Sequence, residues 1–182
     1  MKYAIFSSPL GSVLIAASER GITWMGFGDS DEDALAEIRT DFPTAELTRD
    51  DGDRELRRYC AAILAFLERR FSFPALPLDL NGTPFQRRVW DELCAIPHGT
   101  TRSYGEIARR VGRPDAPRAV GAAVGANPVS ILVPCHRAVA ADGSLHNYRY
   151  GIERKRALLD IEGVPLRDGR DLQRTLSLGR AG

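Results

Sequence analysis

The sequence predicts an α+β fold in which a small antiparallel sheet is followed by a mainly helical half. Runs of β-branched and aromatic residues, broken by turn residues, open the chain. Helical periodicity and helix-capping pairs dominate after residue 80. The proline-containing segment 74–82 separates the two patterns, so we expect one domain at residues 1–80 and a second at residues 81–182.

The first half is expected to form a three-stranded antiparallel meander followed by two helices. The strands are predicted at residues 2–8, 11–18 and 21–28. Ser30 and the acidic residues after it predict the start of one helix. A second helix is expected from about residue 54 to residue 70, and Cys60 lies on its apolar face as a core residue.

Length and composition exclude several classes of protein. The chain has 182 residues, 43% of them hydrophobic, and no apolar run approaches the ~20 residues that a membrane span needs. Its first residues lack the long apolar stretch of a secretory signal, so a cytoplasmic protein is expected. Three widely spaced cysteines argue against a disulfide framework and against a cysteine-rich zinc site.

Charge is distributed unevenly along the chain. Residues 1–80 hold 9 basic and 14 acidic side chains, whereas residues 81–182 hold 16 basic and 10 acidic side chains. The net charges of the two parts are therefore −5 and +6. A basic second half favours a polyanionic partner for that half.

The second half opens with a helix whose start is marked by three capping residues. Thr83 suits the N-cap, Pro84 suits the first helical position, and Gln86 completes a capping box. Cys94 falls on the apolar stripe of this helix and is expected to pack in the core.

Two short helices around a tight turn form a candidate helix-turn-helix. Ser103 and Glu106 form the capping box of the first, which runs through about residue 111, and the second is expected over residues 118–126. After Arg118 the second helix contains only Ala, Gly and Val, and its two glycines lower helix propensity. Such small side chains fit either tight helix–helix packing or insertion into a narrow groove, and composition leaves both interpretations open.

Cys135 is the candidate nucleophile. A short apolar run at residues 129–133, flanked by prolines, predicts a buried strand that ends just before Cys135. His136 and Arg137 follow, and neighbouring cations increase the thiolate fraction of a cysteine. The alternative is a third buried structural cysteine. Unlike the other two cysteines, Cys135 lies on no amphipathic helix, which favours the nucleophile.

A last helix is expected over residues 152–162, with the basic residues 154–156 as a solvated face. Glu162 lies at its C-terminal end, where the helix dipole disfavours a carboxylate that is neither solvated nor paired with a cation. The polar residues 164–182 are expected to be partly disordered.

Together these motifs resemble a known family. The run Val133-Pro134-Cys135-His136-Arg137, preceded by Asn127-Pro128, looks like the active-site motif of the O6-alkylguanine-DNA alkyltransferases. The resemblance extends in the same order over residues 83–86, Trp90, residues 103–104, residues 118–121, Tyr148, Gly151 and residues 162–163. The chain as a whole is similar to the C-terminal half of the bacterial adaptive-response protein.

The resemblance implies both fold and function. It implies a ribonuclease H-like sheet in residues 1–80 and a DNA-binding, alkyl-transferring domain in residues 81–182. The implied reaction moves an alkyl group from O6 of guanine in double-stranded DNA, with O4 of thymine as a secondary expectation, to Cys135 after the damaged nucleotide flips out. Each molecule would act once, because the thioether product is stable. The resemblance also implies a monomer that needs no cofactor.

Carried over residue by residue, the family pattern implies catalytic roles. Cys135 would accept the alkyl group, His136 would act as a base through a water, and Glu162 would orient the imidazole. Asn127 would brace the turn that holds the site. Tyr104 would protonate the leaving guanine, whose anion is a poor leaving group.

The resemblance also implies a DNA-binding helix and a base pocket. The helix over residues 118–126 would enter the minor groove, with Arg118 filling the gap left by the flipped nucleotide. The implied DNA-binding residues are Arg118, Ala119, Gly121, Ala122 and Tyr104. The implied pocket residues are Tyr148, Arg149, Tyr150, Val133, Pro134 and Trp90. No metal is expected, because no cysteine precedes Cys60 and no histidine precedes His98.

The pocket loop departs from the family pattern. Asn147 and Tyr150 stand where relatives often carry glycine and tryptophan, Arg149 replaces a small residue of some relatives, and His146 is bulky. The range of alkyl groups is therefore left open.

Three other functions compete with alkyl transfer. A damage-binding protein without transfer activity is disfavoured by the presence of Cys135. A helix-turn-helix regulator would need longer side chains than residues 119–126 offer to read bases. A cysteine hydrolase would leave Tyr104, Arg118 and the basic second half unexplained.

Overall fold

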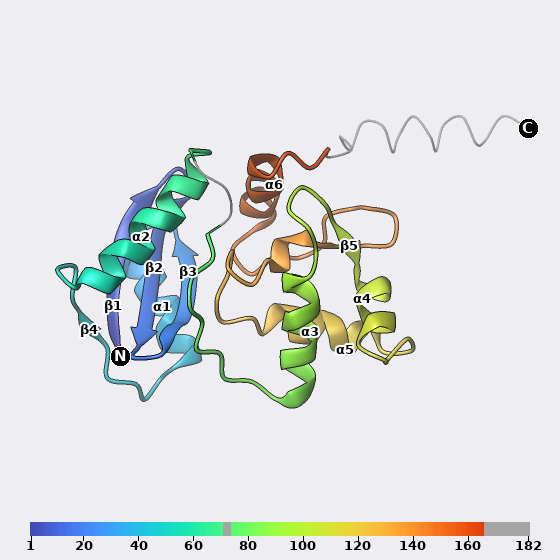
Figure 1. Cartoon of the computed structure of the whole chain (residues 1–182), viewed down its shortest axis with the longest axis horizontal. Coiled ribbons are helices and arrows are strands. Elements are labelled where there is room, and N and C mark those ends of the chain that lie inside the picture. Colours follow the sequence, from blue (N-terminus) through green and yellow to red (C-terminus); the bar gives the residue numbers. More distant parts are fainter. Residues whose placement is uncertain (71–73, 166–182) are drawn as a thin grey trace, which may run out of the picture.

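The computed structural model describes residues 1–70 and 74–165, which form a sheet-containing N-terminal half and a mainly helical C-terminal half (Figure 1). The first half contains β1 (Lys2–Ser8), β2 (Gly11–Ser18), β3 (Gly21–Gly28), α1 (Asp31–Asp41), β4 (Thr48–Arg49) and α2 (Arg54–Leu67). The second contains α3 (Pro84–Cys94), β5 (Arg102–Ser103), α4 (Tyr104–Arg110), α5 (Pro117–Gly125), a short 3₁₀ helix η1 (Cys135–Arg137), β6 (Ala138–Val139) and α6 (Ile152–Ile161). The predicted α+β fold is confirmed.

The N-terminal sheet has the strand order β3-β2-β1-β4. Strands β1, β2 and β3 pair antiparallel with the predicted boundaries, and the unpredicted β4 adds two residues parallel to β1. Side chains alternate between the two faces of β2. Val13 and Ile15 belong to the same core cluster as residues of α2, whereas Leu14 and Ala16 pack with residues of α1. The two helices therefore cover opposite faces of the sheet.

The core crosses from one half of the chain into the other. One cluster of buried residues combines the sheet and α2 with Val129, Ile131, Leu132, Tyr150 and Leu158 of the second half. The Tyr150 ring packs edge-on against Phe27 at 5.6 Å between ring centroids. A Cβ added at Gly26 would lie 2.3 Å from the Tyr150 hydroxyl oxygen, so only glycine permits this close approach.

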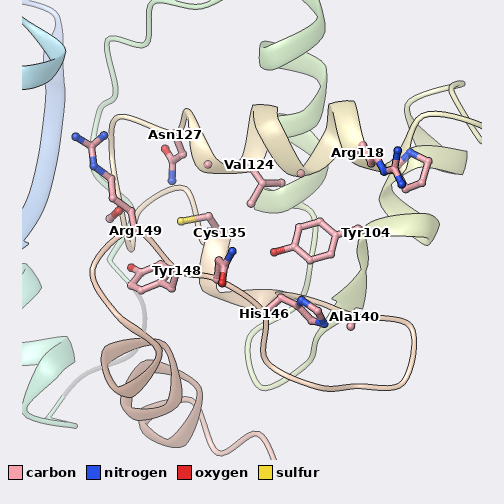
Figure 2. Close-up of a pocket in the computed structure, with 14 residues that line it drawn as sticks. Tyr104, Arg118, Val124, Asn127, Cys135, Ala140, His146, Tyr148 and Arg149 are labelled. Atoms are coloured by element: carbon pink, nitrogen blue, oxygen red, sulfur yellow. The ribbon is translucent and has the colours of Figure 1, made fainter.

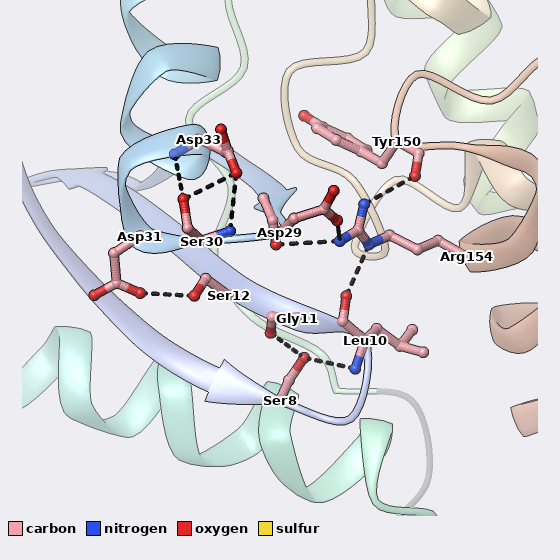
Figure 3. Close-up of polar contacts among 11 residues, drawn as sticks. Ser8, Leu10, Gly11, Ser12, Asp29, Ser30, Asp31, Asp33, Tyr150 and Arg154 are labelled. Carbon is pink, nitrogen blue, oxygen red and sulfur yellow. Dashed lines mark hydrogen bonds and ion pairs between the residues drawn. The ribbon is translucent and has the colours of Figure 1, made fainter.

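Arg154 of α6 joins the two halves by several hydrogen bonds (Figure 3). Its guanidinium donates to the carbonyl oxygens of Leu10 and Gly28, at 2.7 and 3.1 Å, and pairs with the Asp29 carboxylate at 2.5 Å. It also donates to the Tyr150 carbonyl oxygen at 3.1 Å. These contacts hold α6, and the chain that precedes it, against the turns at one end of the sheet.

In the C-terminal half, α3, α4 and α5 pack around a second cluster of buried residues that includes Trp90, Ile107 and Val120. The Trp90 indole N–H donates to the Ala123 carbonyl oxygen at 2.9 Å and thereby joins α3 to α5. Residues 111–116 connect α4 to α5, and the two helices contact each other. Cys94, expected in the core, is exposed at the end of α3.

The prediction of a strand at residues 129–133 is wrong. These residues are buried, as expected, but they form a tight turn in which Val129 makes an isolated bridge with Met25. Ile131 has a φ of 69°, which is incompatible with a strand. The prolines on both sides favoured extended backbone, but the side-chain hydrogen bonds of Asn127 close the segment instead.

Within residues 1–70 and 74–165, no helix is both long and apolar enough to cross a membrane. The polar tail after residue 165, for which disorder was expected, lies outside the described residues.

Candidate active site

A cavity of about 630 Å³ lies between α5 and the loop that connects β6 to α6 (Figure 2). Tyr104, Asn127, Ser130 and Cys135 line its interior. Its rim on the α5 side consists of Pro117, Arg118, Gly121, Val124 and Gly125. The opposite wall consists of Ala140, His146, Asn147, Tyr148 and Arg149. The structure thus brings residues from four separate parts of the second half to one place.

Cys135 is the first residue of η1, directly after the tight turn. The Asn127 side chain holds both ends of that turn: its amide donates to the Val133 carbonyl oxygen at 2.8 Å, and its oxygen accepts from the Val129 N–H at 3.0 Å. Burial raises the pKa of the Cys135 thiol. Hydrogen bonding from Asn127 and Ser130 and the positive charge of Lys155 act in the opposite direction. The thiol is therefore held in a fixed place, with polar groups that favour the thiolate.

His136 and Glu162 form a buried pair beside Cys135. Nε2 of His136 lies 2.9 Å from Oε1 of Glu162, and neither side chain is exposed. Arg137 donates to both oxygens of the same carboxylate, each at 2.8 Å. Burial alone would raise the pKa of Glu162, but the hydrogen bonds from His136 and Arg137 bring it down to about 2. The helix end therefore carries an ionised carboxylate whose partners offset the unfavourable dipole.

The ionised Glu162 fixes the tautomer of His136. A carboxylate accepts, so Nε2 of His136 donates and Nδ1 keeps its lone pair. Burial lowers the pKa of His136, which keeps the ring neutral at physiological pH. Nδ1 is buried and has no hydrogen-bond partner among the described residues. The ring is thus a neutral base with one free acceptor nitrogen.

Residues 154–156 were expected to form a solvated basic face, and this is wrong for Arg154, which binds the N-terminal half, and for Lys155. The Lys155 side chain is fully buried, and its ammonium donates to the carbonyl oxygens of Ala138 and His146 at 2.7 and 3.1 Å. Burial lowers the pKa of Lys155 to about 8. The sequence contains a signal for this position: Lys155, Leu158 and Glu162 recur at helical spacing and share the buried face of α6.

Tyr104 and Arg118 lie on the side of the cavity formed by α4 and α5 (Figure 2). The Tyr104 hydroxyl points into the cavity, and burial together with the charge of Cys135 raises its pKa. Arg118 lies near the start of α5 and is exposed. A Cβ added at Gly121 or Gly125 would meet no atom within 4 Å, so the packing of the described chain does not require glycine at either position. For the two glycines of this helix, the interpretation as tight helix–helix packing is therefore wrong.

Several residues expected at the site lie outside the cavity. Ala119 and Ala122, for which contact with DNA and not a place in the pocket is expected, are exposed on α5. Tyr150 turns toward the N-terminal sheet, and Trp90 packs under α5. Val133 and Pro134 are buried, but their side chains do not line the cavity because the turn places Ser130 there instead. Ser130 carried no sequence signal, since its approach depends on a turn that the apolar pattern concealed.

Comparison with known proteins gives the same family for both halves. The family model described as "6-O-methylguanine DNA methyltransferase, DNA binding domain" matches residues 84–164, and that of the "ribonuclease-like domain" matches residues 1–80. The methylated-DNA–protein-cysteine methyltransferase of Methanosarcina acetivorans is 39% identical over 163 residues, which cover 90% of this chain and 99% of that protein.

Two further similarities define the extent of the match. The regulatory protein Ada of Salmonella typhimurium is 43% identical over 89% of this chain, but the match spans only 45% of Ada. A crystal structure of Mycobacterium tuberculosis OGT in complex with DNA superposes with a TM-score of 0.77 at 38% identity, over 91% of this chain and 96% of that chain. On these matches, the chain belongs to the family of 6-O-methylguanine DNA methyltransferases.

Proposed function

We propose that this protein repairs double-stranded DNA by moving an alkyl group from O6 of guanine to Cys135, once per molecule. The observation that carries the proposal is the position of Cys135 in the cavity, next to the buried pair of His136 and Glu162. The O4 of thymine, which presents the same alkoxy geometry, is a second substrate of the same site. The residues at the site require no cofactor, and the chain works as a monomer in the cytoplasm.

In the proposed reaction the Cys135 thiol loses its proton to Nδ1 of His136 through a water. The sulfur then attacks the alkyl carbon, an S–C bond forms, and the C–O6 bond breaks. The electron pair of that bond passes to the guanine, and the Tyr104 hydroxyl donates a proton to the ring so that neutral guanine leaves. The proton held by His136 then restores the Tyr104 hydroxyl through solvent. The products are S-alkylcysteine and guanine, and the stable thioether makes the reaction irreversible.

Glu162 and Asn127 act on this chemistry through other groups. Glu162 keeps His136 in the tautomer whose Nδ1 can accept a proton. Asn127 fixes the turn from which Cys135 projects. Both are positioning residues, whereas Cys135, His136 and Tyr104 are catalytic.

We propose that α4 and α5 act as a helix-turn-helix with α5 in the minor groove. The support is the open space beside Gly121 and Gly125, which leaves room for a closely approaching partner. Arg118 forms no hydrogen bond with another described residue and stands at the rim of the cavity, where it can replace a flipped nucleotide in the base stack. Ala119 and Ala122 would face the sugar–phosphate backbone, whose recognition carries no sequence preference.

The alternative is an alkylated-DNA-binding protein that transfers nothing. Such a protein would bind DNA through the same surface, and it would differ only in that the Cys135 sulfur accepts no alkyl group. Intact mass and peptide mapping after incubation with duplex DNA that contains O6-methylguanine separate the two. A gain of one methyl group on Cys135, absent from Cys135→Ser, supports transfer; bound DNA without any mass gain supports the alternative.

Two matched variants sharpen the experiment. Cys94→Ser removes the exposed cysteine, which is the most accessible to unspecific alkylation, and should leave the methyl gain intact. Arg118→Ala should slow repair of duplex DNA much more than reaction with free O6-methylguanine base. An equal loss on both substrates would refute the proposed role of Arg118.

A further inference from the structure

The wall of the cavity opposite α5 is tied to the N-terminal half through Arg149. The guanidinium turns away from the cavity toward that half (Figure 2). Its Nε donates to Oε2 of Glu37 at 2.8 Å, and Nη1 donates to Oδ2 of Asp41 at 2.7 Å. Both carboxylates belong to α1, more than 100 positions away in the sequence. Arg149 therefore belongs to the cavity wall, but its guanidinium is bound by two carboxylates of α1.

The carboxylates that hold Arg149 are themselves fixed. Oδ2 of Asp41 also accepts the indole N–H of Trp24 at 2.7 Å, and Trp24 is fully buried in β3. Helix α1 begins with a complete capping box at Ser30, and its residue Ile38 is fully buried against the sheet. The end of α1 thus provides a rigid support for Arg149.

The contact is partly shielded from solvent. The side chains of Arg149, Glu37 and Asp41 are 25%, 38% and 27% exposed. The guanidinium also lies 5.7 Å from the ring centroid of Tyr150, which packs against Phe27 of the sheet. One cation between two carboxylates and an aromatic ring interacts more strongly than an exposed ion pair.

Other attachments of this wall come from nearby parts of the chain. The His146 carbonyl oxygen accepts from Lys155, and the Tyr148 carbonyl oxygen accepts from the Gly151 N–H at 3.0 Å. Among the described residues 140–149, only Arg149 forms hydrogen bonds with the N-terminal half. Arg149 is therefore the hydrogen-bonded link between this wall and α1, in addition to the packing of Tyr148 and Tyr150 in the shared core.

We propose that the contact of Arg149 with Glu37 and Asp41 is a brace that sets how large an O6 substituent the cavity accepts. The brace rests on the proposed alkyl transfer and deepens it. It keeps residues 146–149 close to α5, so a methyl group fits beside Cys135 and a bulky group such as benzyl is disfavoured. Arg149 is a specificity-determining residue that acts through the wall. Under this proposal the N-terminal half contributes to substrate choice without lining the cavity.

The experiment compares transfer from O6-methylguanine and O6-benzylguanine, each placed in the same duplex oligonucleotide. The protein is tested as wild type, as Arg149→Ala, as the neutral α1 variant Glu37→Gln/Asp41→Asn, and as the triple variant. Asn at position 41 keeps an oxygen for the Trp24 N–H, so the support itself is preserved. Arg39→Ala, which removes another arginine of α1, is the matched control.

Loss of the brace should raise the benzyl-to-methyl ratio of rate constants about fivefold, as expected for a partly shielded ion pair. Arg149→Ala should give the full rise. The neutral α1 variant, whose amide oxygens can still accept from Arg149, should give a smaller rise in the same direction, and the triple variant should give no more than Arg149→Ala. Arg39→Ala should leave the ratio unchanged. High salt should raise the wild-type ratio and leave the ratio of the triple variant unchanged.

Different failures have different meanings. An unchanged ratio in either Arg149→Ala or the neutral α1 variant overturns the brace, as does a proportional fall of both rates. A rise that is confined to Arg149→Ala assigns the effect to the arginine itself and also overturns the brace. If the wild type transfers no methyl group, the proposed function itself is refuted. The methyl substrate alone shows this, without reference to the benzyl-to-methyl ratio.

Discussion

His136 donates its Nε2 hydrogen to Oε1 of Glu162 across 2.9 Å, with both side chains fully buried. Replacing the carboxylate by an amide keeps the shape but removes the charge that orients His136 and pairs with Arg137. We expect Glu162→Gln to slow methyl transfer about 100-fold and to reduce the free energy of unfolding by about 3 kcal/mol. Quenched-flow transfer and urea unfolding check the two effects. An unchanged transfer rate would exclude a role of Glu162 in the proton transfer.

Acid should destabilise the protein within a defined pH range. The folded-state pKa of Glu162 is lowered to about 2. Its stabilising contribution is therefore complete above the unfolded pKa of about 4.3 and is lost as the pH falls toward 2, which amounts to about 3 kcal/mol. Urea unfolding of the wild type and of Glu162→Gln between pH 6 and 2 should show a stability difference that shrinks below about pH 4.3. A difference that is independent of pH would contradict the assignment.

The buried charge of Lys155 should promote thiolate formation at Cys135. The positive charge of Lys155 lowers the pKa of the thiol against the effect of burial. Lys155→Met should therefore reduce the rate at which iodoacetamide labels Cys135 at neutral pH about tenfold, because thiolate is the reactive form. Peptide mapping identifies the labelled cysteine. Arg156→Met, the exposed neighbour on α6, is the control and should have no effect; equal effects of both variants would count against this role.

A larger side chain on α5 should affect DNA binding and leave the fold intact. Gly121→Leu places its side chain in open space and improves helix propensity, so the free energy of unfolding should rise by about 0.5–1 kcal/mol. If α5 enters the minor groove, the same variant should bind duplex DNA at least about tenfold more weakly at fixed salt. Ala61→Leu, on the exposed surface of α2, is the control. Undiminished affinity of Gly121→Leu would place DNA elsewhere.

The elements that the sequence predicted best are those specified by local signals. The three strands have the predicted boundaries because glycine and turn residues end each run. Helices α3 and α4 begin where capping boxes at Thr83 and Ser103 place them. In each case the deciding interactions lie within a few residues along the chain.

The predictions that were wrong concern residues whose conformation or burial depends on specific hydrogen-bond partners outside the repeating pattern. Residues 129–133 form a turn because Asn127 bonds across it and Met25 of the sheet pairs with Val129. Lys155 is buried because the carbonyl oxygens of Ala138 and His146 converge on its ammonium. Composition does not identify such partners, and the helical spacing on α6 indicates only that Lys155 shares the buried face. The division of the chain near residue 80 stays a prediction.

The shared core has a consequence for how the molecule unfolds. Val129, Ile131 and Tyr150 are buried by the sheet and α2, so separation of the halves would expose apolar surface on both. Neither half then retains a complete interior when the other melts. Heating should accordingly give one calorimetric transition, with a van't Hoff enthalpy equal to the calorimetric enthalpy. Although two family models divide the sequence, the molecule is expected to behave as one cooperative unit.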